Sequence, residues 1–477
     1  MSYSQQVVRS FLWHGGGQIA GQAISWVATI VVIRLLSPAD YGLMAMANVF
    51  LGFFLLIADL GFGAAAVQAK ALEREQLRQL LGIVLVTNAG GCVLTLAAAP
   101  VVAAFFGEPR LTAVVMVLSV NFVLLAASVL PQSQLLRELD FRAKARADIL
   151  ATVLAAVTGL VMAWAGLGVW ALVGNSLVMH GVRAVAYNAL RPVALAPAFS
   201  WEAVTRLAQF GALVTVDRLL FFLHGNADAV IGGRVLGKEA LGLYAVALSL
   251  AAIPMEKVLP VITQVSFAAF SRIQGEPDRV RRNVLRSVQV VSLVCFPAFL
   301  GMAAVAGDLV PLLLGTRWLQ LVVPFQLLCL VLPLKAVAVL FTPALFGMGR
   351  PGVNVLNTAV AFVTMAAAML VGVRDGVIGM CAAWVIAYPA VFAVTSWRSL
   401  RALGIPYAEL LKRCAFAAGA SVTMTALVLG LGETLAPHGA SALRLSALVG
   451  IGVLLYAGLV LLFQRGAVRE LLAAARD

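Results

Sequence analysis

Long apolar stretches follow one another along the whole chain, and this pattern decides what the chain can fold into. About fourteen runs of some 20 mostly apolar residues alternate with short polar segments, and about 20 apolar residues cross a bilayer as a helix. A soluble fold of 477 residues would need a charged surface, yet only 12% of the residues are charged. We therefore expect an all-α, polytopic membrane protein without a separate soluble domain.

Basic residues are spread unevenly between the polar segments, which indicates how the helices are oriented. The net charge is +13, and most of the 34 Lys and Arg residues lie in clusters such as Arg142–Arg146 and Arg279–Arg282. Basic clusters hold loops in the cytoplasm. We interpret the charge as topology, with both termini in the cytoplasm, and expect no nucleic-acid partner.

An internal repeat divides most of the chain into similar halves. The segments are RLLSPADYGLMAMA from Arg34 and RVLGKEALGLYAVA from Arg234, which share Arg, Leu, Gly, Leu, Ala and Ala in register. Both segments fall between the first two helices of a six-helix unit, so the repeat is parallel, as in several transporters. We expect two six-helix lobes, residues 1–200 and 201–400, followed by two further helices in residues 401–477.

Sequence motifs for nucleotide, metal and dinucleotide chemistry are absent. The chain has no GxxxxGK[ST] phosphate loop and no HExxH pair, and its five Cys residues lie in apolar runs without CxxC spacing. We therefore predict no cofactor, no metal and no enzymatic activity.

Two acidic residues and a histidine form a stripe inside the seventh apolar run. Asp217, His224 and Asp228 are spaced by seven and four residues, which places them on one helical face, and Glu256 lies in the next run. Ionisable groups within the membrane usually mark partners, cavities or ion pathways. These residues are candidates for coupling transport to a proton or cation, or for ion pairs between helices.

Three basic residues are also expected deep within spans, at broadly similar depth: Arg218, Lys257 and Lys335. Two interpretations stay open, because these cations could neutralise acidic groups on neighbouring helices or line a central cavity. A cationic cavity would bind an anionic cargo.

Aromatic residues near these charges have two possible roles. Phe221, Phe222 and Tyr244 flank the polar stripe and are candidates for lining a cavity, where they would stack on sugars. Trp318 and Trp384 lie near predicted helix ends, where anchoring at the membrane interface is the expected role.

Several longer segments resemble one transporter family. They are VVIRLLSPADYGLMAMANVF with ADLGFGAAAVQ, LRELDFRAKARADI, NADAVIGGRVLGKEALGLYAVA and VSFAAFSRIQ. Together they resemble the Wzx-type polysaccharide flippases of the multidrug/oligosaccharidyl-lipid/polysaccharide exporter superfamily, and most of all the exopolysaccharide branch that includes the colanic-acid exporters.

The resemblance implies a two-lobed bundle of twelve to fourteen helices in the bacterial inner membrane. It implies that an undecaprenyl-pyrophosphate-linked repeat unit moves from the cytoplasmic to the outer leaflet, for exopolysaccharide or lipopolysaccharide synthesis. A polysaccharide polymerase and export machinery would then be partners. The family has no catalytic motif to transfer, so the candidate residues rest on the intramembrane charges alone.

Two other functions are weighed against the flippase. A multidrug or cation antiporter of the same superfamily would favour acidic residues in its cavity, whereas three of the candidates here are cations. A membrane polysaccharide polymerase usually needs acidic residues on a large outer loop, and no outer segment is long enough.

The topology can be tested by labelling from outside the cell. A single Cys at Arg281 should resist an impermeant maleimide, and one at Lys238 should react, because the first lies in a basic cluster and the second in an outer loop. Labelling at position 281 in intact cells would overturn the orientation.

Overall fold

The computed structural model describes residues 26–59, 74–138, 140–193, 196–198, 201–272, 276–434 and 441–464. The side chains of residues 59, 74, 201–217, 257–258 and 260–272 lie outside this description. All regular elements in the described part of the chain are helical, with no strand among them. The prediction of an all-α fold is confirmed.

The chain divides by its contacts into two compact units. The first comprises residues 1–222 and 237–242, and the second comprises residues 223–236 and 243–477. In the first unit a helix at Trp26–Leu35 precedes α2 (Pro38–Asp59), α4 (Arg74–Phe106), α5 (Arg110–Leu118), α6 (Val120–Arg137), α7 (Phe141–Trp164) and α8 (Val169–Leu190).

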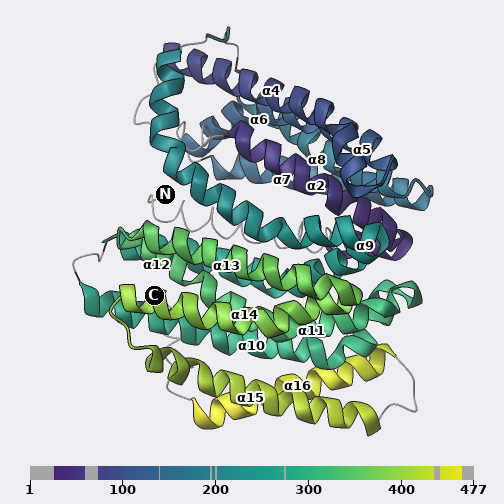
Figure 1. The fold of residues 1–477 in the computed structure, drawn as a ribbon, viewed down its shortest axis with the longest axis vertical. Helices are drawn as coiled ribbons and strands as arrows, with labels where there is room; N and C mark the ends of the chain where they lie inside the picture. Colours follow the sequence, from purple (N-terminus) through teal and green to yellow (C-terminus); the bar gives the residue numbers. More distant parts are fainter. Residues whose placement is uncertain are drawn as a thin grey trace. The chain divides into compact units, whose positions relative to one another are not determined.

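A long helix, α9 (Trp201–Arg272), supplies residues to both units and is broken at Gly237, where φ is 81°. The second unit continues with α10 (Pro277–Leu314), η1 (Thr316–Leu321), α11 (Val322–Val339), α12 (Phe341–Gly347), α13 (Pro351–Gly372), η2 (Val373–Asp375), α14 (Gly376–Ala402), α15 (Tyr407–Thr434) and α16 (Ala442–Phe463). Figure 1 shows α10, α11, α13 and α14 running side by side.

Eleven helical stretches of the described residues are long and apolar enough to cross a membrane. One of them contains the break at Gly237, and another, Pro351–Ala402, contains η2. The start of the first predicted run, near Phe11, lies outside the described residues. The chain is thus a multi-pass membrane protein, while the count of fourteen spans and the division into lobes stay predictions.

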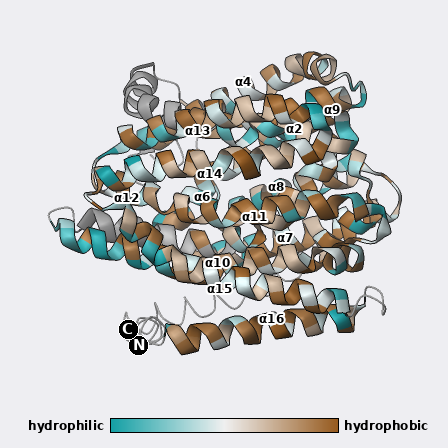
Figure 2. Ribbon diagram, turned by 60° about the horizontal axis from the view of Figure 1, so that its bottom comes forward, coloured by the Kyte–Doolittle hydropathy of each residue, from teal (hydrophilic) through white to brown (hydrophobic). Residues whose placement is uncertain are grey.

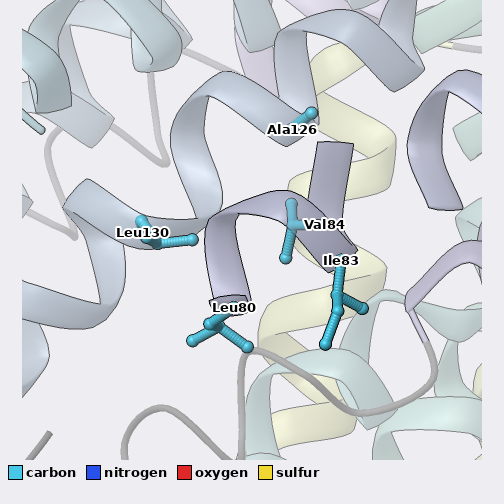
Figure 3. Close-up of a cluster of buried hydrophobic side chains, with 5 residues drawn as sticks. All are labelled: Leu80, Ile83, Val84, Ala126 and Leu130. Carbon is cyan, nitrogen blue, oxygen red and sulfur yellow. The ribbon is translucent and has the colours of Figure 1, made fainter. Parts of the chain in front are cut away.

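A cluster of aliphatic side chains joins α4 to α6 in the first unit (Figure 3). Leu80, Ile83 and Val84 recur at helical spacing, so they share one face of α4. They pack against Ala126 and Leu130 of α6, and none of the five is more than 6% exposed. The contact is apolar throughout and holds the two helices together inside the unit.

A single carboxylate organises the beginnings of α2 and α8. Asp40 Oδ2 accepts hydrogen bonds from the Ser37 hydroxyl at 2.6 Å and the Ser37 N–H at 3.0 Å. Its Oδ1 accepts the N–H of Val169 at 3.0 Å. Free N–H groups at a helix start need such acceptors, so Asp40 fixes the start of α2 against α8.

The last helix, α16, packs on α10 and α15 and is hydrophobic along most of its length (Figure 2). Arg444 near its start forms an ion pair with Asp308 of α10, with the Nη1 and Oδ1 atoms 3.3 Å apart. Leu443, Leu454 and Phe463 are each at least 70% exposed. Lipid is the surrounding that suits such a surface.

Candidate functional site

The break in α9 brings two parts of one helix together around a buried carboxylate. Asp228 precedes the break, is 6% exposed and lies within a membrane span. Its Oδ2 accepts a hydrogen bond of 2.6 Å from the hydroxyl of Tyr244, which follows the break. Its Oδ1 accepts the Ala229 N–H at 2.8 Å.

A tryptophan extends this hydrogen-bonded chain to a third segment. The Trp384 Nε1–H of α14 donates to the Tyr244 hydroxyl oxygen at 2.8 Å. Tyr244 therefore accepts from Trp384 and donates to Asp228, and all three side chains belong to the second unit. Buried polar chains of this kind are rigid when every member is satisfied.

Lys335 of α11 supplies the positive charge of the cluster. Its Nζ lies 4.9 Å from the centre of the Trp384 ring, which is a cation–π distance. Its charge also acts on Asp228 and on His224. The aromatic face offsets part of the cost of a lysine charge in lipid.

His224 completes the group and carries its one orphaned polar atom. It lies one helical turn before Asp228 on α9 and is half-buried. Its Nδ1 is buried and has no hydrogen-bond partner among the described residues. We name Asp228, Tyr244, Trp384, Lys335 and His224 the "charged cluster".

The structure does not test the remaining sequence candidates. Arg218 is exposed and belongs to the first unit, whereas Lys335 belongs to the second. Glu256 is exposed. The side chains of Asp217 and Lys257 lie outside the described residues. The structure thus joins His224, Asp228 and Lys335 and leaves the grouping of the three cations a prediction.

Sequence reasoning misjudged two aromatic members of the cluster. Tyr244 is 2% exposed, so it does not line an open cavity in this structure. The sequence places Trp384 near a helix end as an interfacial anchor, but it is 6% exposed and lies two turns inside α14. Trp318 is likewise fully buried. Their partners lie far away in sequence, so spacing along the chain carried no signal of these contacts.

A second carboxylate, half-buried, ties α7 to α8 in the first unit. Asp148 accepts hydrogen bonds from Lys144 Nζ at 2.6 Å and the Tyr187 hydroxyl at 2.7 Å, and Arg183 Nε lies 2.9 Å away. Two hydrogen bonds and the charge of Arg183 compensate one carboxylate here. We interpret Asp148 as structural, because its charge is fully used within the unit.

A bundle of membrane-spanning helices with a charged cluster inside it is typical of transporters. The family model described as "Polysaccharide biosynthesis protein" matches residues 31–323. The chain belongs to this family. The resemblance to the polysaccharide flippases seen in the sequence is confirmed at that level.

Two curated relatives cover most of the chain. The succinoglycan biosynthesis transport protein ExoT of Rhizobium meliloti is 26% identical over 479 residues, covering 99% of this chain and 96% of its own. The lipopolysaccharide biosynthesis protein WzxC of Escherichia coli is 26% identical over 392 residues, covering 80% of this chain and 78% of its own.

Solved structures share the fold at low sequence identity. The lipid II flippase MurJ in an inward closed conformation matches with a TM-score of 0.75 and 10% identity, covering 96% of this chain and all of that one. An inward-facing multidrug MATE transporter matches with a TM-score of 0.64 and 16% identity, covering 80% of this chain and 95% of that one. At these identities the matches establish the fold.

The role of the Tyr244 hydroxyl can be measured by stability. Tyr244→Phe removes the donor to Asp228 and the acceptor of Trp384, and a hydrogen bond to a charged group is worth about 1.5–3 kcal/mol. We expect the thermal midpoint of the purified protein to fall. Tyr388→Phe is the matched control. Tyr388 lies one turn after Trp384 on α14 and packs against its ring, and its hydroxyl forms no hydrogen bond with a described residue. Equal midpoints for the two variants would contradict a stabilising role.

Proposed function

We propose that the protein is a flippase, a non-enzymatic transporter that moves a lipid-linked oligosaccharide across the membrane for exopolysaccharide or lipopolysaccharide synthesis. The observation that carries the proposal is the match to ExoT over nearly the full length of both chains, since that relative is named a transport protein of succinoglycan biosynthesis. The fold it shares with a lipid II flippase supports the same class of cargo.

The finer parts of the proposal concern cargo and location. We take the cargo to be an undecaprenyl-pyrophosphate-linked repeat unit, and the membrane to be the bacterial inner membrane, with both termini in the cytoplasm. A polysaccharide polymerase and export machinery would then act on the product. The basic clusters between spans support the orientation.

The cargo sets the physical problem that the protein must solve. The lipid tail can stay in the bilayer, but a pyrophosphate and a hydrated glycan need a polar route. Removing water from the pyrophosphate is costly unless fixed cations replace it. In this proposal Arg218, Lys257 and Lys335 provide those cations, and Arg218 grips phosphate oxygens through two parallel hydrogen bonds.

Substitution of Arg218 tests the proposal in a strain that lacks the gene. Arg218→Ala should stop polymer export and cause lipid-linked repeat units to accumulate, because a lost charge-assisted contact costs about 1.5–3 kcal/mol, roughly tenfold to hundredfold in binding. Arg218→Lys keeps the charge and should be impaired only in part. Lys257→Ala and Lys335→Ala should also reduce export.

The measurement is polymer yield together with the lipid-linked oligosaccharide level, at matched protein amounts. Arg374→Ala is the control, because Arg374 is an exposed arginine in the turn η2. Normal polymer yield in all three Ala variants would contradict the proposed cationic route. Failure of the unaltered protein to restore polymer would contradict the flippase function itself.

The charged cluster is our candidate for energy coupling. Asp228 and His224 are titratable groups inside the membrane that share the field of Lys335, and Asp217 and Glu256 belong to the same proposal. A change of proton or cation occupancy at Asp228 would alter the balance of charge with Lys335, which a transport cycle can use.

Coupling predicts that neutral substitutions change how export depends on pH. Asp228→Asn keeps an oxygen for the Tyr244 hydroxyl but removes the charge, so export should fall or lose its pH dependence while the protein still folds. His224→Ala and Asp217→Asn should act in the same direction. Unchanged export by all three variants at every pH tested would make the stripe structural.

A further inference from the structure

Two glycines lie against each other's helix at a distance that no side chain allows. A Cβ built on Gly42 of α2 would lie 1.8 Å from the carbonyl oxygen of Lys238 in α9. A Cβ built on Gly242 would lie 1.7 Å from the carbonyl oxygen of Pro38. Glycine permits this approach, in which Cα–H groups face carbonyl oxygens as at other close helix crossings.

The two glycine–carbonyl contacts are equivalent, because the internal repeat relates the residues of one contact to those of the other. Pro38 and Lys238 are equivalent positions of the internal repeat, as are Gly42 and Gly242, and both pairs are 200 residues apart. Each copy offers its carbonyl to the glycine of the other. A local two-fold relation between the copies produces such reciprocity. We name these four residues the "glycine clasp".

An ion pair fastens the clasp at one side. Lys238 Nζ donates to Glu108 Oε2 at 2.6 Å, and Glu108 lies two residues after the end of α4. The side chains are 31% and 15% exposed, so water screens the pair only in part. Glu108, Lys238 and the clasp glycines all belong to the first unit.

The clasped segment is short and is joined to its surroundings through a flexible residue. Residues 237–242 group with the first unit, while the chain on both sides, residues 223–236 and 243 onward, groups with the second. Gly237, at the start of the segment, has a φ of 81°, a conformation that side chains disfavour. Such a glycine lets the direction of the following helix change.

We propose that the glycine clasp and the Lys238–Glu108 pair form a releasable latch, closed in this structure, which opens once in each cycle to let the cargo leave on the outer side. Carbonyl oxygens and ion-pair groups regain water when they separate, which offsets part of the free-energy cost of opening these contacts. Alternating access needs contacts that form and break in this way. The inference rests on the proposed transport cycle and on the predicted outer position of Lys238.

Distance measurement tests whether the latch opens, whatever the cargo. After replacement of the five native cysteines, spin labels are attached at Arg110→Cys and Glu239→Cys, two exposed positions beside Glu108 and Lys238. We expect two distance populations, with the longer one enlarged by Lys238→Ala. The charge exchange Lys238→Glu with Glu108→Lys should restore the shorter one. A single unchanged distance in all variants would overturn the latch.

Cross-linking tests whether opening is required. Glu108→Cys with Lys238→Cys is bridged by a short bis-thiosulfonate reagent, and loss of maleimide labelling verifies the bridge. Export should stop and return after reduction. Glu276→Cys with Arg279→Cys, an exposed pair at the start of α10, should tolerate the same bridge. Unimpaired export by the locked protein would make the clasp a permanent joint.

The two experiments separate this inference from the proposed function. If the unbridged Glu108→Cys, Lys238→Cys protein does not restore polymer although the native protein does, the distance populations alone decide the latch. If the native protein does not restore polymer, the flippase function fails, and the latch is again decided by whether the longer distance exists and responds to Lys238→Ala.

Discussion

Close approach of helix backbones is the interaction on which this structure depends. Lipid tails are as apolar as Leu side chains, so helices in a bilayer gain little from hydrophobic burial and rely on tight packing and hydrogen bonds. Glycines supply the closest contacts here. Gly372 and Gly379 face each other across the α13–α14 turn, where a Cβ on either would come within 2.4 Å of the other's carbonyl oxygen. Gly42 and Gly242 repeat this device between helices far apart in sequence.

The same solvent forces every intramembrane charge to find a partner. Asp308 and Arg444 pair between α10 and α16, and Asp228 gathers donors from both parts of α9 while Lys335 stands nearby. A charge left alone in lipid costs several kcal/mol. The positions of charged residues are therefore a map of contacts between helices, and most such contacts are structural. In the charged cluster, His224 Nδ1 has no hydrogen-bond partner among the described residues and so retains capacity to bind.

Sequence patterns predicted the helices and part of the site because both follow from local rules. Apolar length predicted the spans, and depth within them singled out His224, Asp228 and Lys335 as groups that need explanation. The sequence did not predict the hydrogen bond between Trp384 and Tyr244, because that bond depends on where the indole and the hydroxyl point after α9 and α14 have packed. The repeat singled out Gly42 and Gly242 as equivalent, but equivalence along the chain does not say that two residues touch.

Helix α9 contributes residues both to the charged cluster and to the glycine clasp, on either side of its break at Gly237. Asp228 lies nine residues before it and Tyr244 seven residues after it, so their hydrogen bond spans the break. Helical segments are stiff, and a bond between the two arms therefore fixes the angle at which they meet. Lys238 and Gly242 lie on the arm whose direction that angle determines. The Asp228–Tyr244 hydrogen bond and the clasped segment therefore share one helix and its non-helical residue, Gly237.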